Sequence, residues 1–254
     1  MIIVITGASS GFGAAIARRY AAAGGHRIIA VGRRQARLEA LVVELGADVV
    51  YPLVLDVRDR AAVAAVLSAL PAELAAIDLL VNNAGLALGL APAQRAELDD
   101  WDTMVDTNVR GLMYMTRAVL PGMVARDRGH IVNLGSVAGC YAYPGGNVYG
   151  ATKAFVRQFS LNLRSDLLGS RVRVTDVEPG LVGGSEFSLV RFGGDAQKAA
   201  KLYEGADALT PEDVAETVYW VSSLPARVNI NTIELMPVTQ ASGPLAIHRF
   251  SAGG

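Results

Sequence analysis

Short runs of valine, isoleucine and leucine alternate along the chain with longer segments in which apolar residues recur at helical spacing, as in βαβ units. The short runs are apolar at successive positions, which is expected of strands buried on both faces. They predict strands at residues 2–6, 28–32, 49–56, 79–81, 130–134, 172–177 and 232–235. The sequence therefore predicts an α/β fold with a doubly wound parallel sheet of about seven strands and helices on both faces.

The longest predicted helices span residues 101–125 and 149–168 and carry more apolar surface than one sheet face requires. After the sixth predicted strand the pattern loosens from residue 183 to residue 208, where glycine pairs at 183–184 and 193–194 provide flexible joints. We expect this lid segment (183–208) to cover the carboxyl edge of the sheet. Because no repeat or polar linker divides the sequence, residues 1–254 are predicted to form a single domain.

Composition excludes several classes of function. Lysine and arginine number 23 against 24 acidic residues, so the chain offers no general attraction to nucleic acid or anionic membranes. Hydrophobic residues make up 52% and charged residues 19%, which excludes disorder. The first residues read as a strand and not as a signal peptide, and Pro71, Glu73 and Asp78 interrupt the most apolar stretch. We therefore expect a cytoplasmic protein that neither spans a membrane nor binds nucleic acid.

Cysteine and histidine are too few for a disulfide or a metal centre. Cys140 is the single cysteine, and His26, His130 and His248 are scattered. We expect no metal. Cys140 is predicted to be a small buried packing residue, and His130 to have a capping or packing role at the start of the fifth strand.

A glycine-rich turn follows the first predicted strand, with Gly7, Gly11 and Gly13 at G-x-x-x-G-x-G spacing. Gly7 permits the tight turn, Gly11 leaves room for a pyrophosphate, and Gly13 lets the next helix pack on the strand with its N-terminus toward the anion. An ordinary βα turn is the alternative, but the position after the first strand of a parallel sheet favours a nucleotide. The predicted cofactor-binding residues of this loop are Gly7, Ser9, Ser10, Gly11, Phe12 and Gly13.

Residues after the second and third strands bear on the identity of the nucleotide. Arg33 and Arg34 follow strand two, where an acidic residue would select NAD, whereas two guanidinium groups suit the 2′-phosphate of NADP. A solvated basic patch is the alternative, since Arg37 follows. Asp56 and Val57 are predicted cofactor-binding residues: Asp56 could accept a hydrogen bond from the adenine amino group, or could instead cap the following helix.

Tyr149 and Lys153 are four residues apart and therefore leave one face of a predicted helix. A nearby ammonium stabilises phenolate over phenol, which would lower the pKa of the tyrosine and let it act as general acid or base at an alcohol or carbonyl oxygen. Ser136 ends the fifth predicted strand. A packed tyrosine with a lysine reaching to solvent is the alternative.

Taken together, these motifs resemble the short-chain dehydrogenase/reductase family from residue 2 to residue 237. The resemblance implies a Rossmann-type fold in which Ser136 binds the substrate oxygen, Tyr149 transfers the proton and Lys153 binds the nicotinamide ribose. It also implies that Asn108 supports a proton-relay water. It also assigns the nicotinamide end of the cofactor to Asn83 and to the backbone of residues 179–182, which include Pro179, Gly180 and Val182. The small residues Ala84 and Gly85, in the turn after the fourth predicted strand, would let a nucleotide lie over the sheet edge.

Several stretches, among them residues 82–89, 145–160, 178–183 and 228–232, are similar to the NADP-dependent 3-hydroxy acid dehydrogenases. This similarity implies oxidation of the β-hydroxyl of a small acid such as serine, allo-threonine or 3-hydroxypropionate to the 3-oxo acid or semialdehyde, and the reverse reduction. It also implies a homotetramer, in which the long helices would bury their apolar faces.

Two other functions compete with this interpretation. One is a short-chain reductase for ketones, sugars or acyl thioesters, and the other is an NADP sensor without catalysis. A 3-hydroxy acid enzyme must neutralise the substrate carboxylate. Arg191 in the lid segment is the predicted substrate anchor, with a solvated arginine as the alternative and His248 and Arg249 as the other candidates.

Overall fold

Seven parallel strands form one sheet in the computed structural model, which describes residues 1–242. The strands are β1 (Ile2–Thr6), β2 (Arg27–Gly32), β3 (Val50–Val54), β4 (Leu79–Asn82), β5 (Gly129–Leu134), β6 (Val172–Pro179) and β7 (Thr232–Leu235). Their order is β3-β2-β1-β4-β5-β6-β7, so the direction of winding reverses between β1 and β4. Ligands of open α/β sheets bind at such a switch point, outside the carboxyl ends of the strands. The predicted fold class is confirmed.

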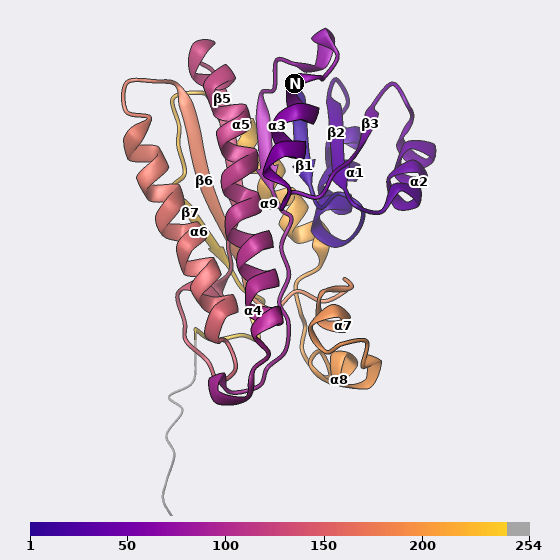
Figure 1. Cartoon of the computed structure of the whole chain (residues 1–254), viewed down its shortest axis with the longest axis vertical. Helices are drawn as coiled ribbons and strands as arrows, with labels where there is room; N and C mark the ends of the chain where they lie inside the picture. The colour runs from indigo at the N-terminus through magenta and orange to yellow at the C-terminus, as the bar shows by residue number, and fades with distance from the viewer. Residues whose placement is uncertain (243–254) are drawn as a thin grey trace, which may run out of the picture.

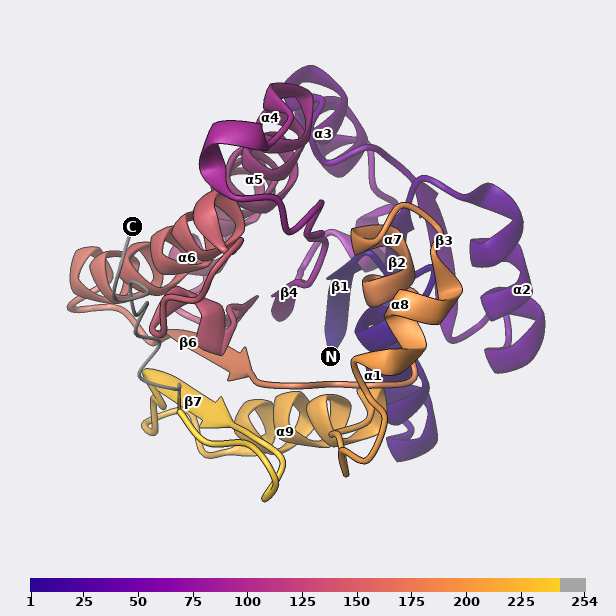
Figure 2. The same cartoon turned by 90° about the horizontal axis from the view of Figure 1, so that it is seen from below.

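Helices cover both faces of this sheet (Figures 1 and 2). One buried cluster joins β1 and β2 to α1, α2 and α9, and a second cluster on the opposite face includes residues of α3, α5 and α6. The helices are α1 (Gly11–Ala23), α2 (Gln35–Leu45), α3 (Arg60–Ser68), α4 (Leu98–Val105), α5 (Leu112–Ala125), α6 (Asn147–Asp166), α7 (Phe187–Arg191), α8 (Ala196–Lys201) and α9 (Pro211–Ser223).

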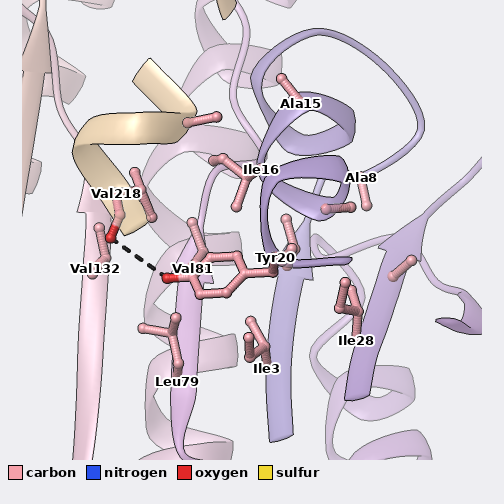
Figure 3. Packing of buried hydrophobic residues seen from close by; sticks show 14 of the residues in the cluster. Ile3, Ala8, Ala15, Ile16, Tyr20, Ile28, Leu79, Val81, Val132 and Val218 are labelled. Carbon is pink, nitrogen blue, oxygen red and sulfur yellow. Dashed lines mark hydrogen bonds between the residues drawn. The ribbon is translucent and has the colours of Figure 1, made fainter. Parts of the chain in front are cut away.

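Tyr20 fixes the helix that follows the glycine-rich turn. Its ring is fully buried beside Ile3 and Leu79, and its hydroxyl donates to the carbonyl of Val218 at 3.5 Å (Figure 3). The same hydroxyl contacts Ser222 on α9. Burial of an aromatic side chain with a satisfied hydroxyl stabilises the fold by roughly 1.5–3 kcal/mol. The contact therefore holds α1, and with it the start of the glycine-rich turn, against α9.

Most strands match the predicted ranges to within two residues, and three boundary differences have a bearing on the site. The third strand ends at Val54 rather than at residue 56, and α6 begins two residues before the predicted start. The helix predicted over residues 101–125 begins at Leu98 and is interrupted by a π-helical turn, Asp106–Gly111. A π turn inserts one residue into the helical repeat without changing which residues are apolar, so periodicity does not reveal it.

The lid segment contains α7 and α8, which lie beyond the carboxyl ends of the strands (Figures 1 and 2). The amide of Gly89 donates to the carbonyl of Arg191 at 3.0 Å, which ties α7 to the loop after β4. Movement of this segment stays a prediction. Among the helices of residues 1–242, none has the length and apolar character needed to cross a membrane.

Candidate active site

A cavity of about 330 Å³ opens at the carboxyl edge of the sheet, where the winding reverses. Its walls bring together residues that lie far apart in the sequence, from the glycine-rich turn to α6. The predicted site residues that line it are Gly7, Ser9, Ser10, Gly11, Phe12, Arg33, Arg34, Asp56, Val57, Asn83, Ala84, Gly85, Tyr149 and Lys153. The predicted cofactor residues and the predicted catalytic pair therefore share one cavity.

The glycine-rich turn has the form that a bound pyrophosphate requires. Gly7 has φ +67°, and a Cβ there would lie 2.9 Å from Nδ2 of Asn83. A Cβ on Gly13 would lie 2.3 Å from the carbonyl oxygen of Gly7, so only glycine lets α1 begin this close to β1. Gly11 has φ +51°, and the nearest atom to a Cβ placed there would be Cβ of Ser185, at 3.4 Å. The backbone and the helix N-terminus beyond it fit a dinucleotide phosphate.

Asn83 stabilises this turn through hydrogen bonds to Thr6. Its Nδ2 donates to the carbonyl of Thr6 at 2.8 Å, and its backbone amide donates to the Thr6 hydroxyl at 3.0 Å. The side chain predicted to hold the nicotinamide end is thus engaged by β1, while the backbone of Asn83, Ala84 and Gly85 lines the cavity.

The two arginines after β2 have different surroundings. Arg34 donates to the carboxylate of Glu186 at 2.9 Å and to the Ser10 hydroxyl at 2.7 Å. Arg33 lies near Asp56, and its positive charge helps to lower the pKa of that carboxyl. Glu186 belongs to the lid segment. A phosphate bound by Arg34 would therefore compete with Glu186 for the guanidinium that now joins the lid segment to the glycine-rich turn.

Asp56 does not cap the following helix. Asp59 caps α3 by accepting from the amide of Ala62 at 3.0 Å. The carboxylate of Asp56 accepts from Nη2 of Arg58 at 2.6 Å, and this hydrogen bond is the main reason that its pKa is lowered. Arg58 lines the cavity and was missed in the sequence, where a charged residue in a turn carries no distinguishing signal.

Tyr149 and Lys153 face the sheet because α6 buries a helical stripe. The buried residues of α6 are Tyr149, Thr152, Lys153, Val156, Ser160 and Leu163, at spacings of three and four. Lys153 does not reach to solvent: it is 7% exposed, and its Nζ donates to the carbonyl of Leu134 at 2.6 Å. This excludes the alternative of a lysine extended into water.

The acidity of Tyr149 differs from the prediction. Burial raises the pKa of its phenol to about 12, against the opposing effects of a hydrogen bond with the Ser136 hydroxyl and of the Arg191 guanidinium. The expected lowering by Lys153 is therefore wrong for the protein by itself. Nζ of Lys153 lies 5.9 Å from the centroid of the Tyr149 ring, and the cost of burying a phenolate outweighs its attraction to that ammonium.

Ser136 and Asn108 are not among the residues that line the cavity. The Ser136 hydroxyl accepts from the amide of Ala138 at 3.1 Å and is 3.5 Å from the carbonyl of Pro179. Asn108, in the π-helical turn, donates to the carbonyl of Leu86 at 2.9 Å and to the Thr152 hydroxyl at 3.0 Å. The amide of Leu86 donates in turn to Asn108. Asn108 therefore joins the loop after β4 to α6.

The residues predicted around the end of β6 lie outside the lining of this cavity. Gly180 donates its amide to Leu235, and a Cβ on it would lie 2.4 Å from Oε1 of Gln240. Val182 is 8% exposed and pairs with Leu209. With Pro179, these residues fix the entry to the lid segment.

Arg191 approaches Tyr149 from the lid segment. Its guanidinium carbon lies 5.5 Å from the centroids of both the Tyr149 and Tyr143 rings, and its Nη2 donates to the Tyr143 hydroxyl at 2.7 Å. Nε donates to the carbonyl of Gly89 at 3.4 Å. Tyr143 was missed in the sequence, as were Ser185, Glu186 and Phe187 of the lining, because their positions depend on the packing of distant segments. His248 and Arg249 lie outside the described residues.

Cys140 is exposed, so the prediction of a buried packing residue is wrong. Its Sγ and the carboxylates of Glu178 and Glu234 lie within 4.8 Å of one another. The carboxylate of Glu178 is already paired with Nη1 of Arg157 at 2.9 Å. His130 is buried, as predicted, and its Nε2 lies 2.9 Å from the Thr175 hydroxyl.

Comparison with known proteins places this geometry in context. A sequence profile described as short chain dehydrogenase matches residues 1–188. An NADP-dependent 3-hydroxy acid dehydrogenase of Salmonella typhi is 64% identical over 98% of this chain and 100% of its own length. A serine 3-dehydrogenase of Agrobacterium fabrum is 52% identical over 98% of both chains.

Solved structures show the same likeness. The closed form of serine dehydrogenase complexed with NADP⁺ superposes with a TM-score of 0.96 at 64% identity, covering 98% of this chain and 100% of that one. An alcohol dehydrogenase from the archaeon Thermococcus sibiricus, complexed with 5-hydroxy-NADP, superposes with a TM-score of 0.81 at 25% identity, covering 94% of this chain and 97% of that one.

Proposed function

This chain belongs to the short-chain dehydrogenase family, and from that membership we propose that it is an NADP-dependent oxidoreductase of small 3-hydroxy acids. The substrates would be of the serine, allo-threonine and 3-hydroxypropionate type, interconverted with 3-oxo acids or semialdehydes. The observation that carries the proposal is that Tyr149 and Lys153 share one cavity with the glycine-rich turn. The names of the relatives with 64% and 52% identity support the substrate class.

Tyr149 is the proton-transfer group of this proposal. In the oxidative direction the substrate hydroxyl gives its proton to the phenolate of Tyr149, and the carbon–oxygen double bond forms as a hydride leaves the carbon. NADP⁺ supplies the acceptor for that hydride when it is bound. In the reductive direction the phenol returns the proton to the carbonyl oxygen. The raised pKa of Tyr149 favours the phenol at neutral pH and therefore suits reduction.

Three neighbours support this proton transfer. Ser136, which follows β5 and is hydrogen-bonded to Tyr149 of α6, would donate a hydrogen bond to the substrate oxygen. Lys153 would hold the nicotinamide ribose, since its ammonium lies in the cavity wall. Asn108 would hold a relay water, supported by its fixed hydrogen bonds to Leu86 and Thr152. We propose Arg33 and Arg34 for the 2′-phosphate, and the glycine-rich turn for the pyrophosphate.

The rates of oxidation and of reduction should depend on pH in different ways. Oxidation needs the Tyr149 phenolate, whose pKa burial raises to about 12, so kcat/KM for oxidation should rise steadily from pH 7 to pH 10 without a plateau. Reduction needs the phenol and should show no loss from Tyr149 over that range. Initial rates in both directions, in buffers of constant ionic strength, check this. A plateau of the oxidative rate below pH 8 would contradict it.

Arg191 is the proposed carboxylate anchor. Its planar guanidinium lies beside the Tyr149 ring and is held there by Tyr143 and Gly89, so its charge is fixed next to the proposed proton-transfer group. A small acid is short enough to place its carboxylate on Arg191 and its hydroxyl at Tyr149. Arg191 also opposes the raised pKa of Tyr149, which places its charge close to the proton-transfer group. An uncharged ketone has no use for this cation, which disfavours the competing reductase function.

Replacing Arg191 tests the anchor. We expect Arg191→Met to raise KM for 3-hydroxy acids by about 10- to 100-fold, the scale of a lost charge-assisted contact, and to spare NADP affinity. Arg191→Lys should lie in between, and the exposed Lys201→Met on α8 is the matched lid control. The measurement compares acids with uncharged alcohols in steady-state assays. Equal losses on both substrate types would assign Arg191 a purely structural role.

The substrate class itself is tested by a panel. Serine, allo-threonine, 3-hydroxypropionate and 3-hydroxyisobutyrate are assayed with NADP⁺, beside simple ketones with NADPH. Higher kcat/KM on the acids supports the proposal, whereas a preference for ketones supports the competing reductase. Binding of NADP without turnover of any substrate would support the sensor function.

We further propose a cytoplasmic homotetramer. The apolar residues Met113 and Val124 on α5 and Leu98 on α4 are exposed, and such residues can be buried between subunits. Light scattering of the purified protein measures the oligomeric state, and a monomer at micromolar concentration would contradict this assignment.

A further inference from the structure

Asp176 is an ionisable residue in the interior with no assigned task. It is fully buried in β6, and neither carboxylate oxygen has a hydrogen-bond partner within residues 1–242. A Cβ on Gly135 would lie 2.5 Å from Oδ1 of Asp176, so the backbone just after β5 packs directly against the carboxyl group. A buried carboxyl without a partner is costly, and each such group in a native protein requires an explanation.

The side chain of Asp176 points to the sheet face that α6 covers. Residues 172, 174, 176 and 178 alternate to one side of β6, and Val172 and Val174 belong to the buried cluster that includes Leu163 of α6. Lys153 of α6 reaches the same place, because its Nζ donates to the carbonyl of Leu134, the residue before Gly135. Lys153 and Asp176 therefore both lie next to the peptide between Leu134 and Gly135, at the end of β5.

The other charged groups around Asp176 are already paired or lie farther out. Glu178, on the same face of β6, is paired with Arg157 of α6 at 2.9 Å. Cys140, after β5, contacts Glu178, and Glu234 on β7 binds the Tyr141 hydroxyl at 3.2 Å. Tyr149 on α6 is uncharged at neutral pH because burial raises its pKa to about 12. Lys153 is thus the cation left for Asp176.

We propose that Asp176 is the buried counter-charge of Lys153, a positioning residue that keeps the lysine an ammonium as the pH rises. Two carboxyl groups lie two residues apart on one strand face, and α6 brings a cation to the side of each: Arg157 pairs with Glu178, and Lys153 is available to Asp176 once that carboxyl ionises. The functional part of this inference rests on the proposed role of Lys153 in binding the ribose.

The titration of the two groups agrees with this arrangement. Burial lowers the pKa of Lys153 to about 8, and the negative charge of Asp176 opposes that change. Burial, followed by the neighbouring Glu178, raises the pKa of Asp176 to about 8, against the attraction of Lys153 and Arg157. The Asp176 carboxylate therefore forms at a higher pH than an ordinary aspartate does, and once formed it stabilises the ammonium. The counter-charge therefore acts on the alkaline side, where alcohol oxidation is favoured.

The test measures the pKa of Lys153 directly in the protein alone. Lys153, Lys198 and Lys201 are the lysines of the sequence, so protein labelled with ¹³C-lysine reports Lys153 beside two surface lysines in one NMR titration. Lys153→Arg assigns the signal. In Asp176→Asn we expect the pKa of Lys153 to fall by about one unit, a tenfold loss of proton affinity, while Lys198 and Lys201 stay unchanged.

Glu234→Gln is the matched control, because Glu234 pairs with Glu178 in the sheet but lies exposed. It should leave the pKa of Lys153 within about 0.3 units of wild type. If Asp176→Asn fails to fold, Asp176→Ser removes the carboxylate without adding bulk beneath Gly135. A Lys153 pKa that rises, or changes by less than about 0.3 units, in the folded variant would overturn the proposal. This outcome is independent of which substrate the enzyme turns over.

A second readout comes from thermal stability. The carboxyl of Asp176 has a raised pKa in the folded protein, so the folded state holds more protons than the unfolded chain between about pH 4 and pH 8. Its contribution to stability is therefore lost as the pH rises through that window. We expect Tm of Asp176→Asn minus Tm of wild type to become more positive from pH 5 to pH 8. A constant difference would show that the pKa of Asp176 is not raised in the folded protein; the NMR titration of Lys153 decides whether Asp176 is the counter-charge.

Discussion

Tyr149→Phe should lower kcat in both directions by about 100-fold or more, because it removes the hydroxyl proposed to transfer the proton while keeping the ring. The ring packs against Phe187 with centroids 5.9 Å apart, and the side chain is 8% exposed. The variant therefore loses no packing and should keep both its fold and its affinity for NADP. Steady-state assays with a 3-hydroxy acid, and NADP binding by calorimetry, measure the two effects separately.

Tyr141→Phe is the matched control for this experiment. Tyr141 lies five residues after Ser136, is partly exposed and contacts Glu234 outside the cavity. Its loss should leave kcat within about twofold of wild type, since surface substitutions rarely exceed 0.5 kcal/mol. If Tyr149→Phe kept turnover within tenfold of wild type, another group would have to transfer the proton.

Replacing Arg33 with Asp and Arg34 with Ala should reverse or abolish the preference for NADP over NAD. Each guanidinium contact to a phosphate is worth about 1.5–3 kcal/mol, so losing two of them should raise KM for NADP by at least 100-fold. The introduced carboxylate repels the 2′-phosphate and can accept from the ribose hydroxyls of NAD. The measurement is kcat/KM for both cofactors at one fixed substrate concentration.

The single variants separate two effects of these arginines. Arg34 also binds Glu186 of the lid segment, so Arg34→Ala should disturb the lid segment as well as the phosphate, whereas Arg33→Asp should act on the cofactor alone. Arg37→Ala is the matched control, since Arg37 pairs with Glu186 at 3.4 Å but does not line the cofactor cavity. A double variant with an unchanged ratio for NADP and NAD would mean that Arg33 and Arg34 form a solvated patch.

Local patterns in the sequence predict the features that depend on a few neighbouring residues. Strand runs, helical stripes and the glycine spacing at residues 7–13 predict the sheet, its helices on both faces and the site of the cofactor turn. The spacing of Tyr149 and Lys153 predicts that they share one helical face, because four residues make about one turn. These features follow from backbone geometry and need no knowledge of the remaining chain.

The sequence by itself determined the parallel α/β architecture, the family and the shared helical face of Tyr149 and Lys153, the proposed catalytic pair. Only the tertiary structure decided how acidic Tyr149 is, that Glu186 pairs with Arg34, and that Arg191 meets Tyr149. It also decided that Asp176 lies beneath Gly135 on the side of Lys153. The physical reason is that desolvation and charge pairing depend on which distant segments pack together and on the water that they exclude.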